Sequence, residues 1–449
     1  MKENIINRFL KGDQRTALAK KNIVLSFFIK GVSIILSLVI VPLTIGYVTS
    51  TQYGLWLTIS SILGWFSYFD MGLTHGFRNK FAEAKAKNDV LLARQYLSTT
   101  YITMVVIFTV VFIVFGFVNC YIDWAQLLNV EENMNTDLRN VCFVILFFFC
   151  VNMILRPIST LIIADQKPAY ASFIDMIGQL LVLVTIFLLT KTVHGSLFIL
   201  ALVVSSVPVI VLLITSLVLY NGYYRLYKPS LALSEKNKVK DIVGLGGKFF
   251  MIQISSIFVF QAMNLLISNT KGPESVTVFN IAYKYFFVFN MLFSIVVSPF
   301  WTAFTDAFTK GDFNWMKNVY SKLCKSSYIM IVAVVIALIL SNVVYSIWLG
   351  DLVEIPLSVS IAMALYIIST ILGCVPVTLL NGVGYVKVQM YVHVFYAVIT
   401  VPILLYLFKN FEMYIGLLFA AFNPLTHFIV CSIQIRKILN RTSYGIWNE

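Results

Sequence analysis

Long apolar runs recur along the whole chain, and they constrain its fold more than any other feature. An α-helix needs about 20 apolar residues to cross a bilayer. Inside hydrocarbon each backbone N–H and C=O needs a partner within the protein, which favours helices. The runs lie at residues 23–48, 54–76, 97–122, 138–163, 169–191, 195–221, 244–269, 275–304, 327–349, 355–380, 389–408 and 413–435. We therefore predict an all-α integral membrane protein with about twelve transmembrane helices.

The composition excludes a soluble protein. Of the 449 residues, 59% are hydrophobic and 12% are charged, whereas soluble domains carry about 25% charged residues. The first run is too long for the apolar core of a signal peptide, and no small-residue cleavage site follows it. We expect this run to remain in the protein as a helix.

The positive charges follow an alternating pattern along the chain. The net charge is +13, and Lys and Arg concentrate in the N-terminal segment, residues 77–96, 222–243 and 305–326, and the C-terminal tail. The loops at residues 49–53, 123–137 and 350–354 carry no basic residue. Since basic loops stay on the cytoplasmic side, both termini are predicted to be cytoplasmic. The excess charge is thus a topology signal, and we expect no nucleic-acid partner.

A polar, basic segment near the middle of the chain divides the runs six and six. This symmetry suggests a transporter built from two helical bundles. The predicted division is a cytoplasmic N-terminal segment at 1–22, a six-helix bundle at 23–221, a cytoplasmic linker at 222–243, a second six-helix bundle at 244–436 and a cytoplasmic tail at 437–449.

Polar residues form a stripe within the first run. Lys30 lies about eight residues into it, which is roughly 12 Å along a helix. Ser26, Ser33 and Ser37 share its helical face. Ionisable groups inside membrane spans are expensive unless they face protein or water. We therefore expect this stripe to face the interior of the bundle.

Further polar positions lie within later runs. They are Arg156 and Asp175 in the first half, and Lys248, Gln253, Gln261, Asn264, Asn280 and Lys284 in the second half. Two purely structural interpretations stay open. Lys248 is close enough to the interface to extend its ammonium group into the headgroup region, and Asp175 can serve as a structural partner of Arg156. Together these residues predict a water-filled, mostly cationic central cavity between the two bundles, with Lys30, Arg156, Lys248 and Lys284 as its cations.

No catalytic or metal-binding constellation is visible. The six cysteines have no paired short spacing, and the four histidines have no spacing typical of metal ligands. No phosphate-binding loop of the Walker type occurs. We predict that the chain is not an enzyme and holds no metal or other cofactor.

The second run ends in an unusual change from apolar to charged sequence. Asp70 is placed to pair with Arg78 or with a cation of a neighbouring helix, or to cap the following helix. Gly72 and Gly76 are predicted to let the chain bend out of the membrane. Residues 77–87 alternate apolar and basic residues at helical spacing, which predicts a helix at the inner interface with its basic face toward lipid headgroups.

Three short motifs carry a family resemblance. They are YGLW at Tyr53–Trp56 with DMGLTHGFRNK at Asp70–Lys80, PFWTAFTDA at Pro299–Ala307, and NGVGYVKVQ at Asn381–Gln389. In their order and topology they resemble the bacterial O-antigen and capsular polysaccharide flippases (Wzx-type) of the multidrug/oligosaccharidyl-lipid/polysaccharide exporter superfamily. The resemblance covers nearly the whole chain and implies the two-bundle, MATE-like fold of that superfamily.

The resemblance implies an activity, a location and partners. The activity would be movement of an undecaprenyl-diphosphate-linked oligosaccharide, an O-antigen or capsule repeat unit, from the cytoplasmic to the periplasmic leaflet of the bacterial inner membrane by alternating access. Lys30, Arg156, Lys248 and Lys284 would contact phosphate or acidic sugars, and Asp70, Arg78 and Asp175 would couple to H⁺ or Na⁺ or stabilise one state. Membrane lipids and polysaccharide polymerase or ligase proteins are the expected partners.

Other functions fit the same composition. A cation-coupled drug or small-molecule antiporter of the same superfamily would favour a cavity rich in carboxylates, and a lipid II flippase would often carry extra spans. A membrane glycan polymerase or acyltransferase would need a sizeable outer loop, or His, Arg and Asp residues clustered at one face. The sequence shows neither of these features.

Overall fold

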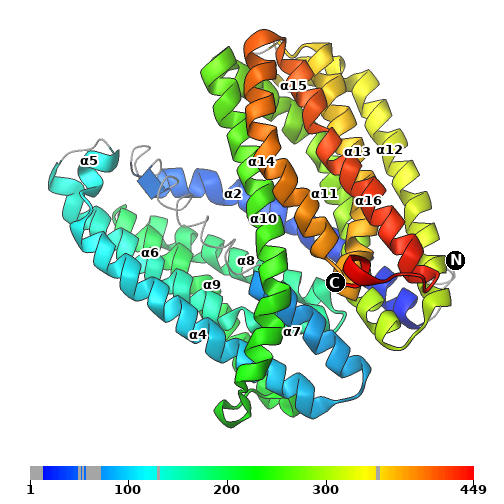
Figure 1. Cartoon of the computed structure of the whole chain (residues 1–449). Helices are drawn as coiled ribbons and strands as arrows, with labels where there is room; N and C mark the ends of the chain where they lie inside the picture. Colours follow the sequence, from blue (N-terminus) through cyan, green and yellow to red (C-terminus); the bar gives the residue numbers. More distant parts are fainter. Residues whose placement is uncertain (1–13, 49–51, 53–54, 57–71, 129–131, 350–353) are drawn as a thin grey trace, which may run out of the picture. The chain divides into compact units, whose positions relative to one another are not determined.

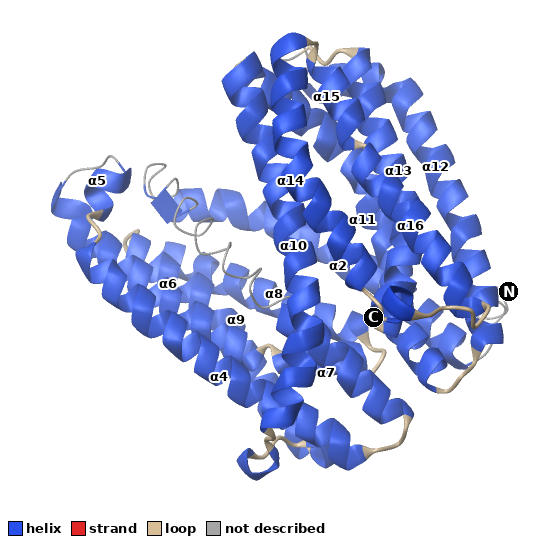
Figure 2. Cartoon of the chain, viewed as in Figure 1, coloured by secondary structure: helices blue, strands red, loops and turns tan. Residues whose placement is uncertain are grey.

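The computed structural model describes residues 14–48, 52, 55–56, 72–128, 132–349 and 354–449, and these residues form helices and connecting loops without any strand (Figure 2). Ten of the described helices are long and apolar enough to cross a membrane, and they coincide with the third to twelfth predicted runs. Helix α2 (Gln14–Tyr47) covers the first run. The second run lies mostly outside the described residues. The prediction of an all-α membrane protein is confirmed.

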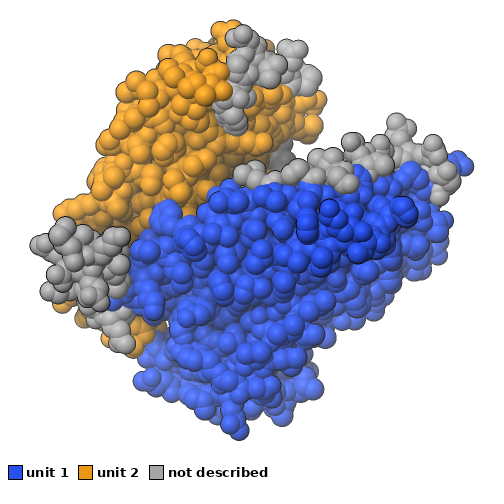
Figure 3. All heavy atoms as spheres, turned by 180° about the vertical axis from the view of Figure 1, so that it is seen from behind, with its two compact units in different colours: residues 1–246 blue, residues 247–449 orange. Residues whose placement is uncertain are grey.

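The chain forms two compact units, Met1–Gly246 and Gly247–Glu449, and their boundary falls inside α10 (Lys236–Lys271) (Figures 1 and 3). The first unit holds α2, a helix at residues 72–86, α4 (Val90–Tyr121), α5 (Trp124–Leu128), η1 (Glu132–Met134), α6 (Asn135–Leu155), α7 (Pro157–Ala164), α8 (Pro168–Thr192), α9 (Leu197–Asn221), η2 (Arg225–Tyr227) and η3 (Leu231–Leu233). Within it α2 packs against α8, and α6 packs against α4 and α9.

The second unit is organised around one buried helix. It holds α11 (Pro273–Thr309), α12 (Phe313–Leu349), α13 (Leu357–Val383), α14 (Lys387–Asn410), α15 (Met413–Ala420), α16 (Phe422–Leu439) and η4 (Gly445–Asn448). Helix α13 packs against α11, α12, α15 and α16 and is the most buried of the ten candidate spans. This helix is therefore the core of the unit.

The glycines of the DMGLTHG stretch serve a helix crossing. Residues 72–86 are helical, so the prediction that Gly72 and Gly76 bend the chain is wrong. A Cβ at Gly76 would collide with the carbonyl oxygen of Ile242, and a Cβ at Gly246 would lie 2.6 Å from the carbonyl oxygen of Gly72. Small residues four apart let two helix backbones approach closely, and this crossing fixes the start of α10 against the 72–86 helix.

The apolar face of the 72–86 helix is turned into the protein. Phe77, Phe81 and Ala84 are fully buried in a cluster that includes Leu97 of α4 and Leu161 of α7. A helix lying on the membrane surface would bury this face in lipid. The segment is thus an integral part of the first unit, and among its charged residues Arg78 is buried while Lys85 is exposed.

Two of the sequence motifs meet in the second unit. The hydroxyl of Thr305 on α11 donates to the carbonyl oxygen of Gly382 on α13 at 2.7 Å. A Cβ at Gly382 would lie 2.5 Å from the carbonyl oxygen of Trp301. Gly384 then ends α13 in a left-handed conformation, with φ of 85°, which favours glycine. The NGVG sequence therefore combines a close helix contact with the short turn into α14.

We predict that Gly246→Ala destabilises the protein by about 1–3 kcal/mol, because the new methyl group collides with backbone that cannot move independently. Gly244→Ala is the matched control, since a Cβ at Gly244 meets nothing within 4 Å. Thermal unfolding in detergent or nanodiscs measures both variants. Equal midpoints for the two variants would contradict the crossing.

Candidate functional site

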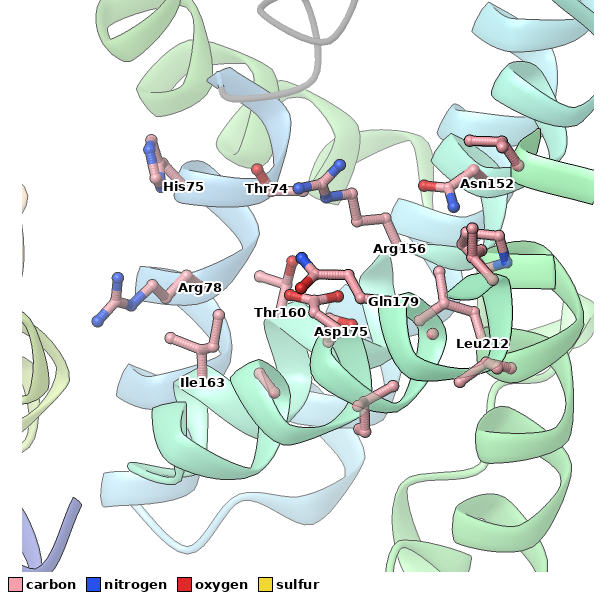
Figure 4. Close-up of a pocket in the computed structure, with 18 of the residues that line it drawn as sticks. Thr74, His75, Arg78, Asn152, Arg156, Thr160, Ile163, Asp175, Gln179 and Leu212 are labelled. Carbon is pink, nitrogen blue, oxygen red and sulfur yellow. The ribbon is translucent and has the colours of Figure 1, made fainter. Parts of the chain in front are cut away.

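A cavity of about 620 Å³ opens among the helices of the first unit (Figure 4). Its lining comes mainly from the 72–86 helix, α6, α7, α8 and α9. The polar lining residues are Thr74, His75, Arg78, Asn152, Arg156, Ser159, Thr160, Asp175 and Gln179. Nine polar side chains in one cavity of an otherwise apolar helical unit mark it as the first candidate site.

A helix break places Arg156 in this cavity. Pro157 begins α7 directly after the end of α6, and proline has no N–H to continue the helical hydrogen bonds. The chain still runs on as a bent helix, since the Arg156 N–H donates to the carbonyl oxygen of Asn152 at 3.0 Å and Thr160 N–H donates to that of Arg156 at 3.2 Å. Arg156 is exposed to the cavity although it lies within a membrane span.

Helix α8 presents the complementary groups. Asp175 and Gln179 are four residues apart and so share one helical face. Figure 4 shows their side chains and that of Arg156 directed toward the same part of the cavity. The two residues predicted as partners, Arg156 and Asp175, are therefore brought together in one site.

One polar atom of this site lacks a partner. Gln179 Oε1 is buried and has no hydrogen-bond partner in the described part of the chain. A buried amide oxygen without a donor is costly, and the cavity has room for several water molecules, each of which takes about 30 Å³. The site is thus suited to a hydrated or polar ligand that brings hydrogen-bond donors to Gln179 and negative charge to Arg156.

Arg78 takes a different direction. It lines the cavity and is 7% exposed. In Figure 4 its side chain and that of His75 lie on the side of the 72–86 helix away from Asp175. Asp70, which was predicted to pair with Arg78, lies outside the described residues.

The polar stripe of α2 does not line this cavity. Ser26 is buried, Lys30 and Ser33 are half-buried, and Ser37 is exposed. The Ser37 hydroxyl donates to the carbonyl oxygen of Ser33 at 2.8 Å. Lys30 is thus only partly withdrawn from the surface of its unit.

In the second unit, two of the predicted polar residues meet. Asn280 Nδ2 on α11 donates to Asn264 Oδ1 on α10 at 2.9 Å. Lys248 and Gln253 are half-buried, and Lys284 is exposed within a membrane span. Gln261 lies in α10, and its side chain is outside the described part of the structure. Lys30 and Arg156 belong to one unit and Lys248 and Lys284 to the other, so the shared cationic cavity stays a prediction.

A buried ionic network was missed by the sequence interpretation. Asp165, at the end of α7, forms ion pairs with Lys85 and with Lys167, the latter at 2.7 Å. The Tyr224 hydroxyl donates to Asp165 Oδ2 at 2.8 Å. Burial raises the pKa of the Tyr224 phenol, which keeps it a neutral donor. The signal was a single carboxylate, followed by a lysine, in the short loop between two apolar runs.

This network joins three segments of the first unit. Lys85 belongs to the 72–86 helix, Asp165 and Lys167 lie between α7 and α8, and Tyr224 follows α9. Asn22 Nδ2 of α2 adds a hydrogen bond to the neighbouring Gln166 carbonyl oxygen at 2.7 Å. Asp165 thus ties together the loop ends on the side of the unit that the basic residues predict to be cytoplasmic.

Comparisons with known proteins agree with this architecture. Residues 19–303 match the sequence model of the family described as polysaccharide biosynthesis protein. A Yersinia pseudotuberculosis protein that carries the name of an O-antigen export protein is 21% identical over 307 residues, which are 67% of this chain and 68% of that protein.

Solved transporter structures share the fold. A multidrug resistance MATE family transporter of the MOP superfamily in the outward-facing conformation has 16% identity and a TM-score of 0.77, over 97% of this chain and 99% of that one. A MOP superfamily transporter from Pyrococcus furiosus Vc1 has 14% identity and a TM-score of 0.77, over 98% of both chains. The MATE-like two-lobed fold is therefore confirmed.

We predict that Asp165→Asn lowers the free energy of unfolding by about 1.5–3 kcal/mol, because the charge-assisted bonds from Lys85 and Lys167 lose their anion. Asp137→Asn, which changes an exposed carboxylate in the first turn of α6, serves as control and should change stability little. Thermal unfolding of both variants in the same detergent tests this. A midpoint of Asp165→Asn that matches the control would show that the network contributes nothing.

Proposed function

Because the chain belongs to the polysaccharide biosynthesis protein family, we propose that it is a flippase that moves an undecaprenyl-diphosphate-linked oligosaccharide across the bacterial inner membrane. The chain is a multi-pass membrane protein with a transporter fold, and both properties suit such a task. The family match, over residues 19–303, is the observation that carries the proposal.

The chemistry of the first cavity supports an anionic, sugar-bearing substrate. A lipid diphosphate is strongly anionic, and arginine binds phosphate through two parallel hydrogen bonds. Arg156 supplies this group within a membrane span, and Gln179, Asn152 and Thr160 offer the neutral hydrogen-bond partners that sugar hydroxyls need. The lipid tail would stay in the bilayer while the charged and sugar parts pass through protein.

We assign Asp175 a balancing role in this mechanism. Without substrate, the carboxylate of Asp175 offsets the charge of Arg156 in the same cavity. An arriving diphosphate would replace it as the partner of Arg156, and the freed carboxylate could then take a proton. Lys30, Lys248 and Lys284 would extend the cationic path between the two units during alternating access, and Asp70 would contribute to coupling.

The cellular setting follows from the same proposal. The basic loops favour cytoplasmic termini, and the substrate would be loaded from the cytoplasmic leaflet. The flipped oligosaccharide would then pass to polymerase or ligase proteins on the other side, which makes these proteins the expected partners alongside membrane lipids.

A cation-coupled drug antiporter is the second candidate, and one observation favours it. Asp175 is a carboxylate in a polar cavity of the first unit, where it would attract a cationic drug. The two functions make opposite demands on this cavity. An anionic substrate depends on Arg156, whereas a cationic drug depends on Asp175.

We predict that deleting the gene abolishes surface polysaccharide and that loaded lipid carrier accumulates in the cytoplasmic leaflet. Rescue by Arg156→Ala should fall about 10- to 100-fold below wild type, as expected for loss of a charged hydrogen-bond partner worth about 1.5–3 kcal/mol. Arg156→Lys should recover part of the activity. Lys30→Ala and Lys284→Ala, at the predicted cationic path, should also reduce rescue. Surface glycan and leaflet-resolved carrier are the two measurements.

Two controls separate the candidates. Lys191→Ala removes an exposed cation at the end of α8 and should rescue fully. Asp175→Asn should reduce glycan export less than Arg156→Ala does if the substrate is anionic, because Arg156 remains. Normal surface glycan in the deletion strain, together with drug tolerance that depends on Asp175, would instead establish the antiporter.

A further inference from the structure

A second cavity lies within the second unit and contains two histidines whose rings are in contact. Its volume is about 320 Å³, and α10, α11, α13, α14 and α16 line it. The imidazole rings of His393 on α14 and His427 on α16 have centroids 3.8 Å apart, with planes inclined by 36°. Both rings belong to membrane spans, where an ionisable group is by default a functional candidate.

The polar groups around the pair are not satisfied by the protein. His427 is 5% exposed, and neither of its ring nitrogens has a hydrogen-bond partner in the described chain. The same holds for Gln389 Oε1 and Asn423 Oδ1, which line the same cavity. His393 Nδ1 does have a partner, the Ser256 hydroxyl at 3.2 Å. The site therefore offers buried amide oxygens and an imidazole nitrogen that accept hydrogen bonds, together with an imidazole N–H that donates one.

The geometry argues against a metal ion as the missing partner. An imidazole binds a metal through a lone pair in the plane of its ring, and two rings whose centroids lie 3.8 Å apart with planes inclined by only 36° leave no room for an ion between their faces. The structure also holds no group of three or more His, Cys, Asp or Glu residues suited to a metal, as far as its described residues go. A transition metal is therefore a poor fit.

The charges around the cavity argue against other ions. Among the described residues that line it there is no carboxylate, lysine or arginine. The titratable groups facing the pair are Tyr366 and Cys374 of α13, whereas α10 and α11 contribute only neutral polar groups, Ser256, Asn290 and Ser294. A sodium ion would find no carboxylate to offset the loss of its water, and an anion would find no cation.

We propose that His393 and His427 form one reversible proton-binding site that takes a single proton per pair from water in this cavity. The proton adds to a ring nitrogen of either imidazole and leaves by the same path, with no covalent step. The new N–H then has Gln389 Oε1 and Asn423 Oδ1 within the cavity as acceptors, reached directly or through water. A second proton is excluded because two imidazolium rings in contact repel each other strongly.

The site stands independently of the transported substrate, but its use in driving transport rests on the proposed function. A proton taken up from one side of the membrane and released on the other would link the second unit to a proton gradient. The first unit holds the charged cavity, and the second unit would hold the proton. Failure of one assignment leaves the other untouched.

The test is a pH titration of protein carrying ¹⁵N- and ¹³C-labelled histidine in nanodiscs, followed by NMR. The chain has only four histidines, and single His→Gln variants assign their signals, with exposed His194 as an internal control. In the wild type we expect His393 and His427 to change together and to bind one proton in total between about pH 4 and pH 8. Two independent protonations, or none over this range, would overturn the proposal.

Variants add a second, sharper readout. In His427→Gln, His393 should take the whole proton, so that its protonated fraction at the acid end of the titration rises above that in the wild type because a competing ring is lost, and His427 should respond in the same way to His393→Gln. His75→Gln changes a histidine of the other unit and should leave the pair unchanged. The wild-type titration already measures how many protons the pair binds. The proposal can therefore be tested even if a variant fails to fold. An unchanged His393 titration in folded His427→Gln would contradict a shared site.

Coupling is measured separately in proteoliposomes with a proton gradient and lipid-linked oligosaccharide. If the pair drives flipping, the His393→Gln and His427→Gln variants should retain substrate binding and lose the dependence of flipping on the gradient. Gradient-driven flipping that is equal in wild type and both variants would refute the coupling role, whatever the NMR result. Absence of flipping by the wild type would count against the proposed function only.

Discussion

Polar groups inside a membrane-spanning protein need partners within the protein or in trapped water, and the rest of this structure depends on that requirement. The helices satisfy their own backbones, which accounts for the purely helical character of the described residues. What remains are the side chains. Asn264 with Asn280, Thr305 with the Gly382 carbonyl, and Ser256 with His393 each join two helices through one hydrogen bond.

Close backbone contacts make these short hydrogen bonds possible. The hydrophobic effect contributes little to the association of helices inside a bilayer. Close packing of small residues therefore provides much of the stabilisation. Gly76 against Ile242 and Gly382 against Trp301 are such contacts, one in each unit. At both places a methyl group would separate the helices. The glycines of these motifs therefore have a packing role, whereas Thr74, His75 and Arg78 of the first motif line the candidate cavity.

The sequence was sufficient for ten of the twelve predicted spans and for the placement of Arg156 and Asp175 in one cavity, but not for contacts between distant helices. Hydropathy located the helices because a membrane span is a local property of about twenty residues. Arg156 and Asp175 were recognisable because a charge in an apolar run stands out. His393 and His427 lie 34 residues apart on different helices, so no local sequence pattern predicts that their rings are in contact. Gly72 and Gly76 were misread since a glycine that bends a chain and one that admits a neighbouring helix look alike in sequence.

The two cavities divide the available chemistry between the units. The first contains opposite charges, Arg156 and Asp175, and so can exchange one ionic partner for another without leaving a lone charge in a poorly polarisable interior. The described residues that line the second cavity are neutral. It can accept a single positive charge only when that charge is spread over several atoms, as it is when two imidazole rings share one proton. An anion that displaces Asp175 and a proton that enters the histidine site would therefore be compatible, since they would bind in different units. On these two proposals, a chain with few intramembrane carboxylates would bind both an anion and a proton.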